Sequence, residues 1–155
     1  MKLLIDADAC PVTSVAVRIA ATRQIPVVLV SDTNHVQHAT GVTCVTVDPG
    51  ADSADLALAN RCAPGDVVIT QDYGVAALAL GRGADALHSS GRRYTDGNID
   101  GLLADRYAAK KQRRACGKHH LKGPPKRTAA DDRAFAAALN ALLDERFSEI
   151  KKGVR

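Results

Sequence analysis

The stretch LLIDADACPV, residues 3–12, places two carboxylates one residue apart at the end of an apolar run. Asp6 closes the run, and Asp8 follows before a segment whose apolar residues recur at helical spacing. A carboxylate that ends a buried strand is costly without a partner. Carboxylate oxygens are also the ligands that hard divalent cations prefer. The stretch therefore predicts a functional site where a strand meets a helix.

Two further acids take comparable positions. Asp72 follows the apolar run 66–70, and Asp55 lies in the first turn of a helix expected over 52–62. Ligands of open parallel sheets bind outside the carboxyl ends of the strands, so Asp6 and Asp72 converge if their strands are neighbours where the strand order reverses. Gathered carboxylates repel one another unless a cation neutralises them, and oxygen ligands select Mg²⁺ or Mn²⁺. The predicted catalytic residues are Asp6, Asp8, Asp55 and Asp72. The predicted metal ligands are Asp6, Asp55 and Asp72.

Each acid also has a structural alternative. Asp8 can cap the helix that follows it. Asp52 and Asp55 suit the N-cap and N3 positions of their helix, where acids stabilise by ~0.5–2 kcal/mol without any metal. Asp72 can brace the turn that precedes the next helix. These roles stay open at the level of sequence.

Short apolar runs alternate with helical patterns through the first ninety residues. Strands are expected at residues 2–6, 25–30, 42–47, 66–70 and 84–88. Helices are expected from Pro11, which suits the first helical position, and over 52–62 and 74–80. The alternation indicates βαβ crossovers and a mostly parallel sheet covered on both faces. The fold class is therefore α/β, a three-layer α/β/α sandwich.

The pattern changes beyond Ser90. A helix over 99–114 becomes densely basic at KKQRR, and a loop rich in Gly, Pro, Lys and His follows. A final helix opens at Thr128 with a capping-box-like TAAD. Its apolar stripe, which should pack on the domain, is Phe135, Leu139, Leu142, Leu143 and Phe147. We predict one domain over 1–155, with an α/β core over 1–90 and a basic helical extension over 91–155.

Charge is distributed unevenly along the chain. Residues 1–91 carry 5 Lys/Arg and 9 Asp/Glu, a net charge of −4, whereas residues 92–155 carry 16 and 8, a net charge of +8. This asymmetry indicates a polyanionic partner, with nucleic acid the leading candidate; a solvated basic surface is the alternative. Aromatic residues are scarce, which favours contacts to the backbone over reading of bases. The candidate phosphate contacts are Arg92, Arg93, Lys110, Lys111, Arg113, Arg114, Lys118, Lys122, Lys126 and Arg127.

The sequence also indicates where the protein resides. No window of 18 unbroken apolar residues is present, so no membrane span is expected. The N-terminus reads as a strand rather than a cleavable leader. Four cysteines are scattered without a CxxC pair, which we interpret as reduced thiols in a cytoplasmic protein.

An ordered set of motifs spans nearly the whole chain: IDADACPV, DSADLALA, DVVITQDYGVAALAL, GRRYTDGNID, KKQRR, KGPPKR and DDRAFAAALNALL. In this order they resemble the YaiI/YqxD family, uncharacterised bacterial proteins with a PIN-like domain. The better-known PIN-like domains are α/β/α sandwiches that act as metal-dependent ribonucleases. The resemblance implies that Asp6, Asp55 and Asp72 are the family's acids, with Asp8 an additional one. The possible positions for a fourth acid of that pattern are Asp96 and Asp100, which lie in the basic part of the chain.

Three functions follow from these observations. The first is a Mg²⁺- or Mn²⁺-dependent nuclease, acting on RNA. The second is a nucleic-acid-binding protein whose acids are structural. The third is a phosphatase of the haloacid dehalogenase kind, with Asp6 as nucleophile and Asp8 as acid–base. The third ranks last because no lysine is well placed between the third and fourth strands.

Overall fold

A computed structural model describes residues 1–8, 10–32, 41–48, 53–115 and 125–153. The side chains of Ser53, Arg113 and Ala115 lie outside the description. The strands are β1 (Leu3–Asp6), β2 (Val27–Asp32), β3 (Thr43–Val47), β4 (Val67–Ile69), β5 (Asp85–Leu87) and β6 (Arg93–Tyr94). The helices are α1 (Thr13–Thr22), α2 (Ser53–Arg61), α3 (Tyr73–Gly81), α4 (Asp96–Ala115) and α5 (Ala129–Lys151).

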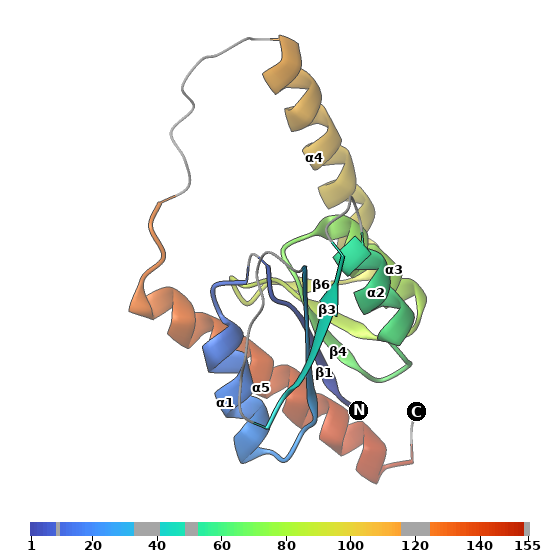
Figure 1. Cartoon of the computed structure of the whole chain (residues 1–155), viewed down its shortest axis with the longest axis vertical. Helices are drawn as coiled ribbons and strands as arrows, with labels where there is room; N and C mark the ends of the chain where they lie inside the picture. Colours follow the sequence, from blue (N-terminus) through green and yellow to red (C-terminus); the bar gives the residue numbers. More distant parts are fainter. Residues whose placement is uncertain (9, 33–40, 49–52, 116–124, 154–155) are drawn as a thin grey trace.

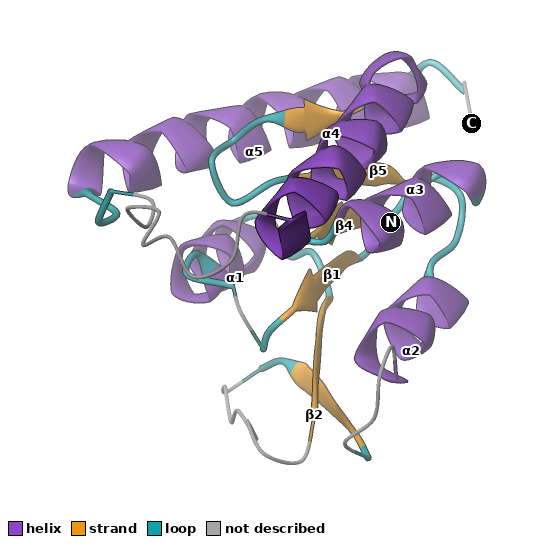
Figure 2. Ribbon diagram, turned by 90° about the horizontal axis from the view of Figure 1, so that it is seen from above, coloured by secondary structure: helices purple, strands orange, loops and turns teal. Residues whose placement is uncertain are grey.

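One sheet holds all six strands, in the order β3-β2-β1-β4-β5-β6, and only β6 runs antiparallel to its neighbour. Two cores lie on its opposite faces (Figures 1 and 2). One core is closed by α1 and α5, and the other by α2, α3 and the first turns of α4. The α/β sandwich expected from the alternating pattern is therefore confirmed.

The central strand β1 is apolar on both faces. Leu3, Leu4 and Ile5 are fully buried, as a strand between two helical layers requires. From β1 the chain builds outward to β2 and β3, then crosses back to place β4 on the other side of β1, with Ile5 opposite Ile69. The strand order reverses between β1 and β4. Their carboxyl ends therefore meet at the point where open α/β sheets bind ligands.

The expected elements are present with boundaries shifted by up to three residues, and two differences have a local cause. Helix α1 begins at Thr13, two residues after Pro11, because residues 10–12 form a turn in which the Thr13 hydroxyl donates to the Cys10 carbonyl at 3.0 Å. Strand β6 was not predicted. It has only two residues, so it carries no periodic pattern, and its pairing with β5 alone defines it.

Helix α4 has two different halves. Ile99, Leu102 and Leu103 pack against the core under α3. From Ala104 to Arg114, every described side chain is exposed, and the helix extends away from the sheet (Figure 1). We call this exposed half, residues 104–115, the α4 arm. It leaves the body on the side where the carboxyl ends of the parallel strands lie.

Helix α5 completes the core opposite α4. Thr128 and Asp131 form the expected capping box, and four residues of the predicted stripe are buried, with Phe147 partly buried. The turn before β6 lies close against α5. Gly91 has φ +88°, and a Cβ there would lie 3.1 Å from the Ala134 carbonyl oxygen and the Ala138 methyl group. Only glycine fits that approach without strain.

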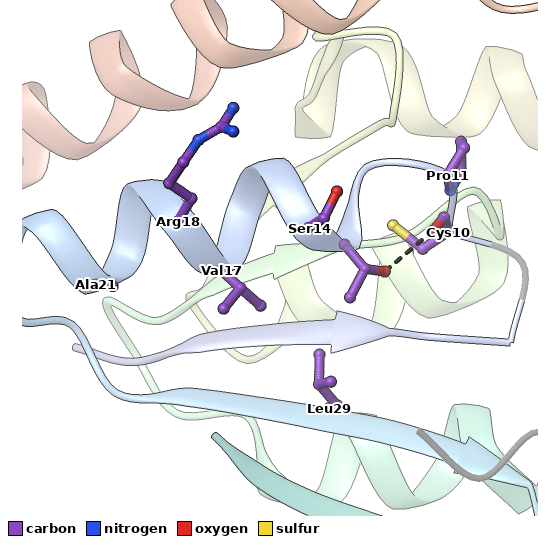
Figure 3. Close-up of a pocket in the computed structure, with 8 residues that line it drawn as sticks. Cys10, Pro11, Ser14, Val17, Arg18, Ala21 and Leu29 are labelled. Carbon is purple, nitrogen blue, oxygen red and sulfur yellow. Dashed lines mark hydrogen bonds between the residues drawn. The ribbon is translucent and has the colours of Figure 1, made fainter. Parts of the chain in front are cut away.

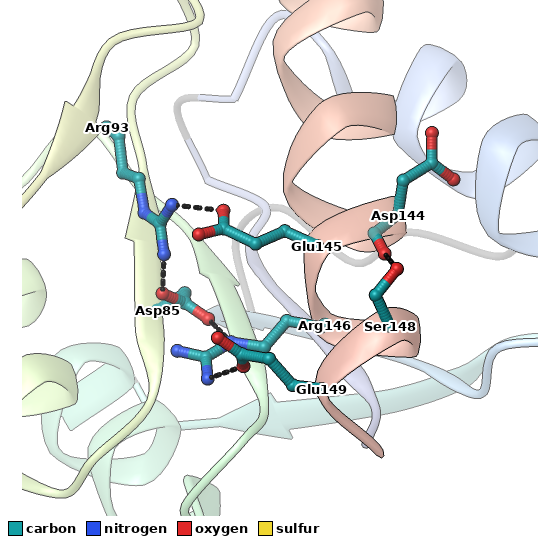
Figure 4. Close-up of polar contacts among 7 residues, drawn as sticks. All are labelled: Asp85, Arg93, Asp144, Glu145, Arg146, Ser148 and Glu149. Carbon is teal, nitrogen blue, oxygen red and sulfur yellow. Dashed lines mark hydrogen bonds and ion pairs between the residues drawn. The ribbon is translucent and has the colours of Figure 1, made fainter. Parts of the chain in front are cut away.

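A buried carboxylate joins α5 to the edge of the sheet (Figure 4). Asp85 in β5 accepts from Arg93 of β6 at 2.7 Å and from the Nε of Arg146 in α5. The two arginines bond in turn to Glu145 at 2.6 Å and Glu149 at 2.7 Å. Burial raises the pKa of Asp85, but the hydrogen bonds from Arg146 and Arg93 outweigh it and hold that pKa below its ordinary value.

Two further features concern the environment of the chain. None of the described helices is long and apolar enough to cross a bilayer. Cys10, Cys44 and Cys62 are free thiols, and Cys116 lies outside the described residues.

We expect Asp85→Asn to lower the free energy of unfolding by about 3 kcal/mol, because it leaves two arginines without their shared carboxylate. This value lies at the lower end of the range for breaking a buried ion pair, because both arginine side chains are partly exposed to water. A carboxyl with a depressed native pKa stabilises above its ordinary pKa and loses that effect as the pH falls through the native value. Urea titrations at neutral pH should show the full difference from wild type, and titrations below about pH 4 should show it shrinking.

Asp144→Asn is the matched control. Asp144 pairs with Arg23 at 2.6 Å, but its side chain is 67% exposed. Its substitution should cost less than about 1 kcal/mol. Equal losses for the two variants would contradict the anchoring role of Asp85.

Candidate functional site

Three carboxylates gather where β1 and β4 end. Asp6 is the last residue of β1, Asp8 follows two residues later, and Asp72 lies just beyond β4. The Thr70 hydroxyl links the two strands, since it donates to Asp6 Oδ2 at 3.0 Å and accepts from the backbone N–H of Asp72 at 3.0 Å. We call Asp6, Asp8 and Asp72 the acidic edge.

Asp6 carries the electrostatic signature of this arrangement. Burial raises its pKa above the ordinary value, and the hydrogen bond from Thr70 offsets part of that effect. The negative charges of Asp8 and Asp72 raise the pKa of Asp6 further. A group whose ionised form is disfavoured by burial and by like charges gains from any cation that binds beside it.

Asp8 ties β1 to β2 rather than capping α1. Both of its carboxylate oxygens accept from the backbone N–H of Asp32, at 3.0 and 3.1 Å. The N-cap residue of α1 is Val12, and no side chain caps that end of the helix. The expectation that Asp8 caps the following helix is therefore wrong. The turn at residues 10–12 separates Asp8 from the start of α1.

Asp72 has the structural role that the sequence left open. It is the N-cap of α3, and its Oδ1 accepts from the backbone N–H groups of Gly74 at 2.7 Å and Val75 at 3.2 Å. Its Oδ2 accepts from Arg106 Nη1 of α4 at 2.7 Å. Burial raises the pKa of Asp72, but the hydrogen bonds from Arg106 and the helix N-terminus outweigh it and lower that pKa. Asp72 is therefore a stable anion.

Asp55 approaches the same region from α2. It lies in the first turn of that helix, where an acid complements the helix dipole, and is half-buried. Its negative charge, with that of Asp72, helps to raise the pKa of Arg106. The charge of Arg106 is therefore stabilised by two of the predicted acids, of which Asp72 pairs with it. Asp52, the other acid of this segment, lies outside the described residues.

The donor chemistry of the acidic edge suits a hard divalent cation, since all of its side-chain donors are carboxylate oxygens. Among the described residues, however, no three His, Cys, Asp or Glu side chains are grouped closely enough to hold a metal ion. Asp72 is turned toward Arg106, which takes the place of a counter-ion. The described carboxylates therefore come together at one edge without forming a complete metal site.

The predicted basic residues fall into separate groups. Arg92 lies at the rim of the site, with its guanidinium 5.9 Å from the ring centroids of Tyr73 and Tyr94. Arg93 instead pairs with Asp85, the buried carboxylate that joins α5 to the edge of the sheet. Arg127 pairs with Asp132 at 2.6 Å. Burial lowers the pKa of His88, which follows β5, and the positive charges of Arg92 and Arg127 lower it further.

The other predicted phosphate contacts lie farther along the chain. Lys110, Lys111 and Arg114 are exposed on the α4 arm, and Lys126 is exposed before α5. The side chain of Arg113 is not described. Lys118 and Lys122 lie outside the described residues.

Sequence reasoning missed Arg106 and Thr70. Arg106 was overlooked because it precedes the KKQRR run and stands among uncharged and acidic neighbours. The available signal was its position one turn before that run, on the helix that follows the site. The sequence pattern indicates only that Thr70 ends a strand, whereas in the structure it is buried and bonds to Asp6.

A hollow of about 560 Å³ lies along α1 (Figure 3). Its walls include Cys10, Val17 and Leu29, and Arg18 is its one charged lining residue, pointing away from the strands. The hollow contains none of the three carboxylates of the acidic edge. It is therefore separate from the site.

Comparison with known proteins adds the family. Residues 4–145 match the model described as "Uncharacterized BCR, YaiI/YqxD family". The chain belongs to this family. The match covers most of β1 to most of α5, so it includes the acidic edge, the α4 arm and Asp85, and it ends one residue before Arg146.

Curated relatives support this membership over their full lengths. A UPF0178 protein of Clostridium acetobutylicum is 53% identical over 143 residues, which cover 92% of this chain and 97% of the relative. UPF0178 proteins of Lachnoclostridium phytofermentans and Exiguobacterium sibiricum are 47% and 46% identical, with 97% and 99% of their lengths covered. No solved structure gives a significant match.

We expect Asp6→Asn to raise thermal stability at neutral pH, because it removes a buried charge that Asp8 and Asp72 repel while keeping an acceptor for Thr70. An acid whose native pKa is raised destabilises the fold above that pKa, and the effect disappears below its ordinary pKa of about 4. Thermal scans without divalent ions should therefore show a gain for the variant at pH 7 that vanishes toward pH 4. Asp100→Asn, on the exposed face of α4, should show no gain at either pH.

Proposed function

We propose that this protein is a metal-dependent nuclease that acts on RNA with Mg²⁺ or Mn²⁺. The observation that carries the proposal is the acidic edge, where the negative charges of Asp8 and Asp72 both raise the pKa of Asp6. The resemblance of its motifs to those of PIN-like ribonucleases supports the same conclusion. The membership shown by comparison is that of an uncharacterised family, so it supports the proposal only through the acids that the motifs contain.

Asp6 and Asp8 would hold the cation, and Asp72 and Asp55 would complete the set. The bound cation would polarise a phosphodiester and lower the pKa of a coordinated water from 15.7 towards ~7 in favourable cases. Thr70 holds the carboxylate of Asp6 in place through a 3.0 Å hydrogen bond. Arg106, which pairs with Asp72 at 2.7 Å, would turn to the substrate phosphate when Asp72 joins the cation.

The α4 arm supports a long polyanionic substrate. Its exposed lysines and arginine stand in a helix that leaves the body beside the acidic edge (Figure 1). Cations spaced along one helix contact successive phosphates without reading bases. The arm would therefore hold the strand while the acidic edge acts on one phosphate.

A nucleic-acid-binding protein without activity is the second candidate. The observation that favours it is the double engagement of Asp72, which caps α3 and pairs with Arg106. In this function the acids would be structural, and binding would not depend on divalent ions.

We expect Mn²⁺-dependent cleavage of single-stranded RNA by the wild-type protein and a loss of roughly a hundredfold or more in Asp6→Asn, since a catalytic metal supplies several kcal/mol. Mn²⁺ should also raise the melting temperature of wild type, by a stabilisation of about 2.7 kcal/mol at about 100 times its Kd, and leave Asp6→Asn unchanged. Product analysis on gels and thermal scans measure the two effects.

Asp100→Asn serves as the matched control and should keep both responses. RNA binding without cleavage, together with no Mn²⁺ effect on melting, would establish the second candidate instead. Cleavage by Asp6→Asn at the wild-type rate, in preparations free of contaminating nuclease, would remove Asp6 from the mechanism.

We expect the α4 arm to account for much of the salt dependence of binding. Replacing Lys110, Lys111 and Arg114 with Gln should reduce the slope of log affinity against log salt by about 2, because each phosphate contact on a single strand contributes about 0.7. Fluorescence anisotropy at several salt concentrations, in chelator, measures this slope. A control variant should remove three positive charges away from the arm: Arg61→Gln, Lys151→Gln and Lys152→Gln. An equal change of slope in both variants would show that only net charge matters.

A further inference from the structure

A hollow of about 500 Å³ opens beside the acidic edge, between the start of α3, the β5–β6 turn and α4. Its walls include Tyr73, Leu102, two arginines, Arg92 and Arg106, and one acid, Asp105. We call it the arginine pocket. Its volume falls within the roughly 300–1,000 Å³ that is usual for ligand pockets. Through Arg106 it borders directly on Asp72 of the acidic edge.

Tyr73 forms an aromatic platform with two cations near its ring. The guanidinium carbons of Arg92 and Arg106 each lie 5.9 Å from the centre of its ring. The buried ring of Tyr94 packs edge-on against it, with centroids 5.8 Å apart and an angle of 65°. This contact fixes the orientation of Tyr73, so the platform is already formed before any ligand binds.

Arg92 is the cation of this pocket with no carboxylate partner among the described residues. Its guanidinium donates to the Tyr73 hydroxyl at 3.4 Å, a long and weak bond, and its side chain is exposed. The neighbouring Arg93, in contrast, pairs with two carboxylates at 2.6 and 2.7 Å. Arg93 is therefore an internal ion-pair partner, whereas the positive charge of Arg92 is available to bind an anion.

We propose that the arginine pocket binds one nucleotide of a single-stranded nucleic acid. The phosphate would bond to Arg92 and, in part, to Arg106, and the base would stack on Tyr73. Guanidinium groups match phosphate oxygens, and stacking on an aromatic ring accepts any base. A duplex keeps its bases stacked inside, so the platform selects unpaired strands.

This inference rests on the proposed function, because the pocket would hold the nucleotide next to the phosphate that lies at the acidic edge. It also identifies a competition. Arg106 bonds to Asp72 in the structure, so a phosphate in the pocket and the Asp72 carboxylate attract the same guanidinium. Removing the charge of Asp72 should therefore strengthen binding. Asn is an equally good N-cap, so Asp72→Asn keeps α3 capped.

The test is anisotropy with a fluorescein-labelled oligouridylate of about ten nucleotides, in chelator, so that no cleavage occurs. Tyr73→Ala should weaken binding by roughly fivefold or more, the effect of one stacked base, without changing the salt slope. Tyr73→Phe should bind like wild type. Arg92→Ala should weaken binding and reduce the salt slope by about 0.7. Asp72→Asn should bind more tightly.

Arg61→Ala is the control, since Arg61 is equally exposed but ends α2, away from the pocket. Wild-type affinity and slope in Tyr73→Ala and Arg92→Ala would overturn the pocket, even where Asp6-dependent cleavage shows that the proposed nuclease is correct. Equal weakening of duplex RNA binding by Tyr73→Ala would overturn the stacking role. Oligonucleotide binding that responds to these variants while wild type cleaves nothing would support the pocket and refute the nuclease.

Discussion

The structure depends on how negative charge is balanced where β1 and β4 end. Three carboxylates meet there, and burial together with mutual repulsion raises the pKa of Asp6. Arg106 relieves part of this charge through Asp72. A buried acid at the opposite edge shows the contrast, since Asp66 accepts from the ammonium group of Lys2 at 2.6 Å and from two backbone N–H groups. The fold itself satisfies Asp66, whereas Asp6 is bonded by the Thr70 hydroxyl and the Asp8 backbone and is repelled by two neighbouring carboxylates.

The same edge shows how one residue serves both fold and site. Asp72 caps α3 with one oxygen and holds Arg106 with the other. The cap fixes the first residue of α3, Tyr73, whose ring packs against Tyr94. A structural role for Asp72 therefore does not exclude a functional one. It sets the positions of the groups that surround the proposed substrate.

The basic part of the chain divides by tertiary position into three uses. Arg93 and Arg146 anchor α5 to β5 through Asp85, and carboxylates of the protein itself neutralise their charges. The guanidinium groups of Arg92 and Arg106 lie near the ring of Tyr73, beside the acidic edge. The α4 arm presents its charges to solvent along a helix. The net charge of residues 92–155 therefore does not indicate which of their lysines and arginines can contact a phosphate.

The sequence by itself determined the α/β sandwich, the positions of Asp6, Asp8 and Asp72 at strand ends, and the capping box at Thr128, because these follow from local periodicity and helix-terminus chemistry. Tertiary structure alone decided the two-residue strand β6, the hydrogen bonds from Asp32 to Asp8, and the pairing of Arg106 with Asp72. It also separated Arg92 from Arg93, which are adjacent in sequence but point to different partners. The physical reason is range: hydrophobic patterns and caps act within a few residues, whereas ion pairs join segments that only the packed sheet brings together.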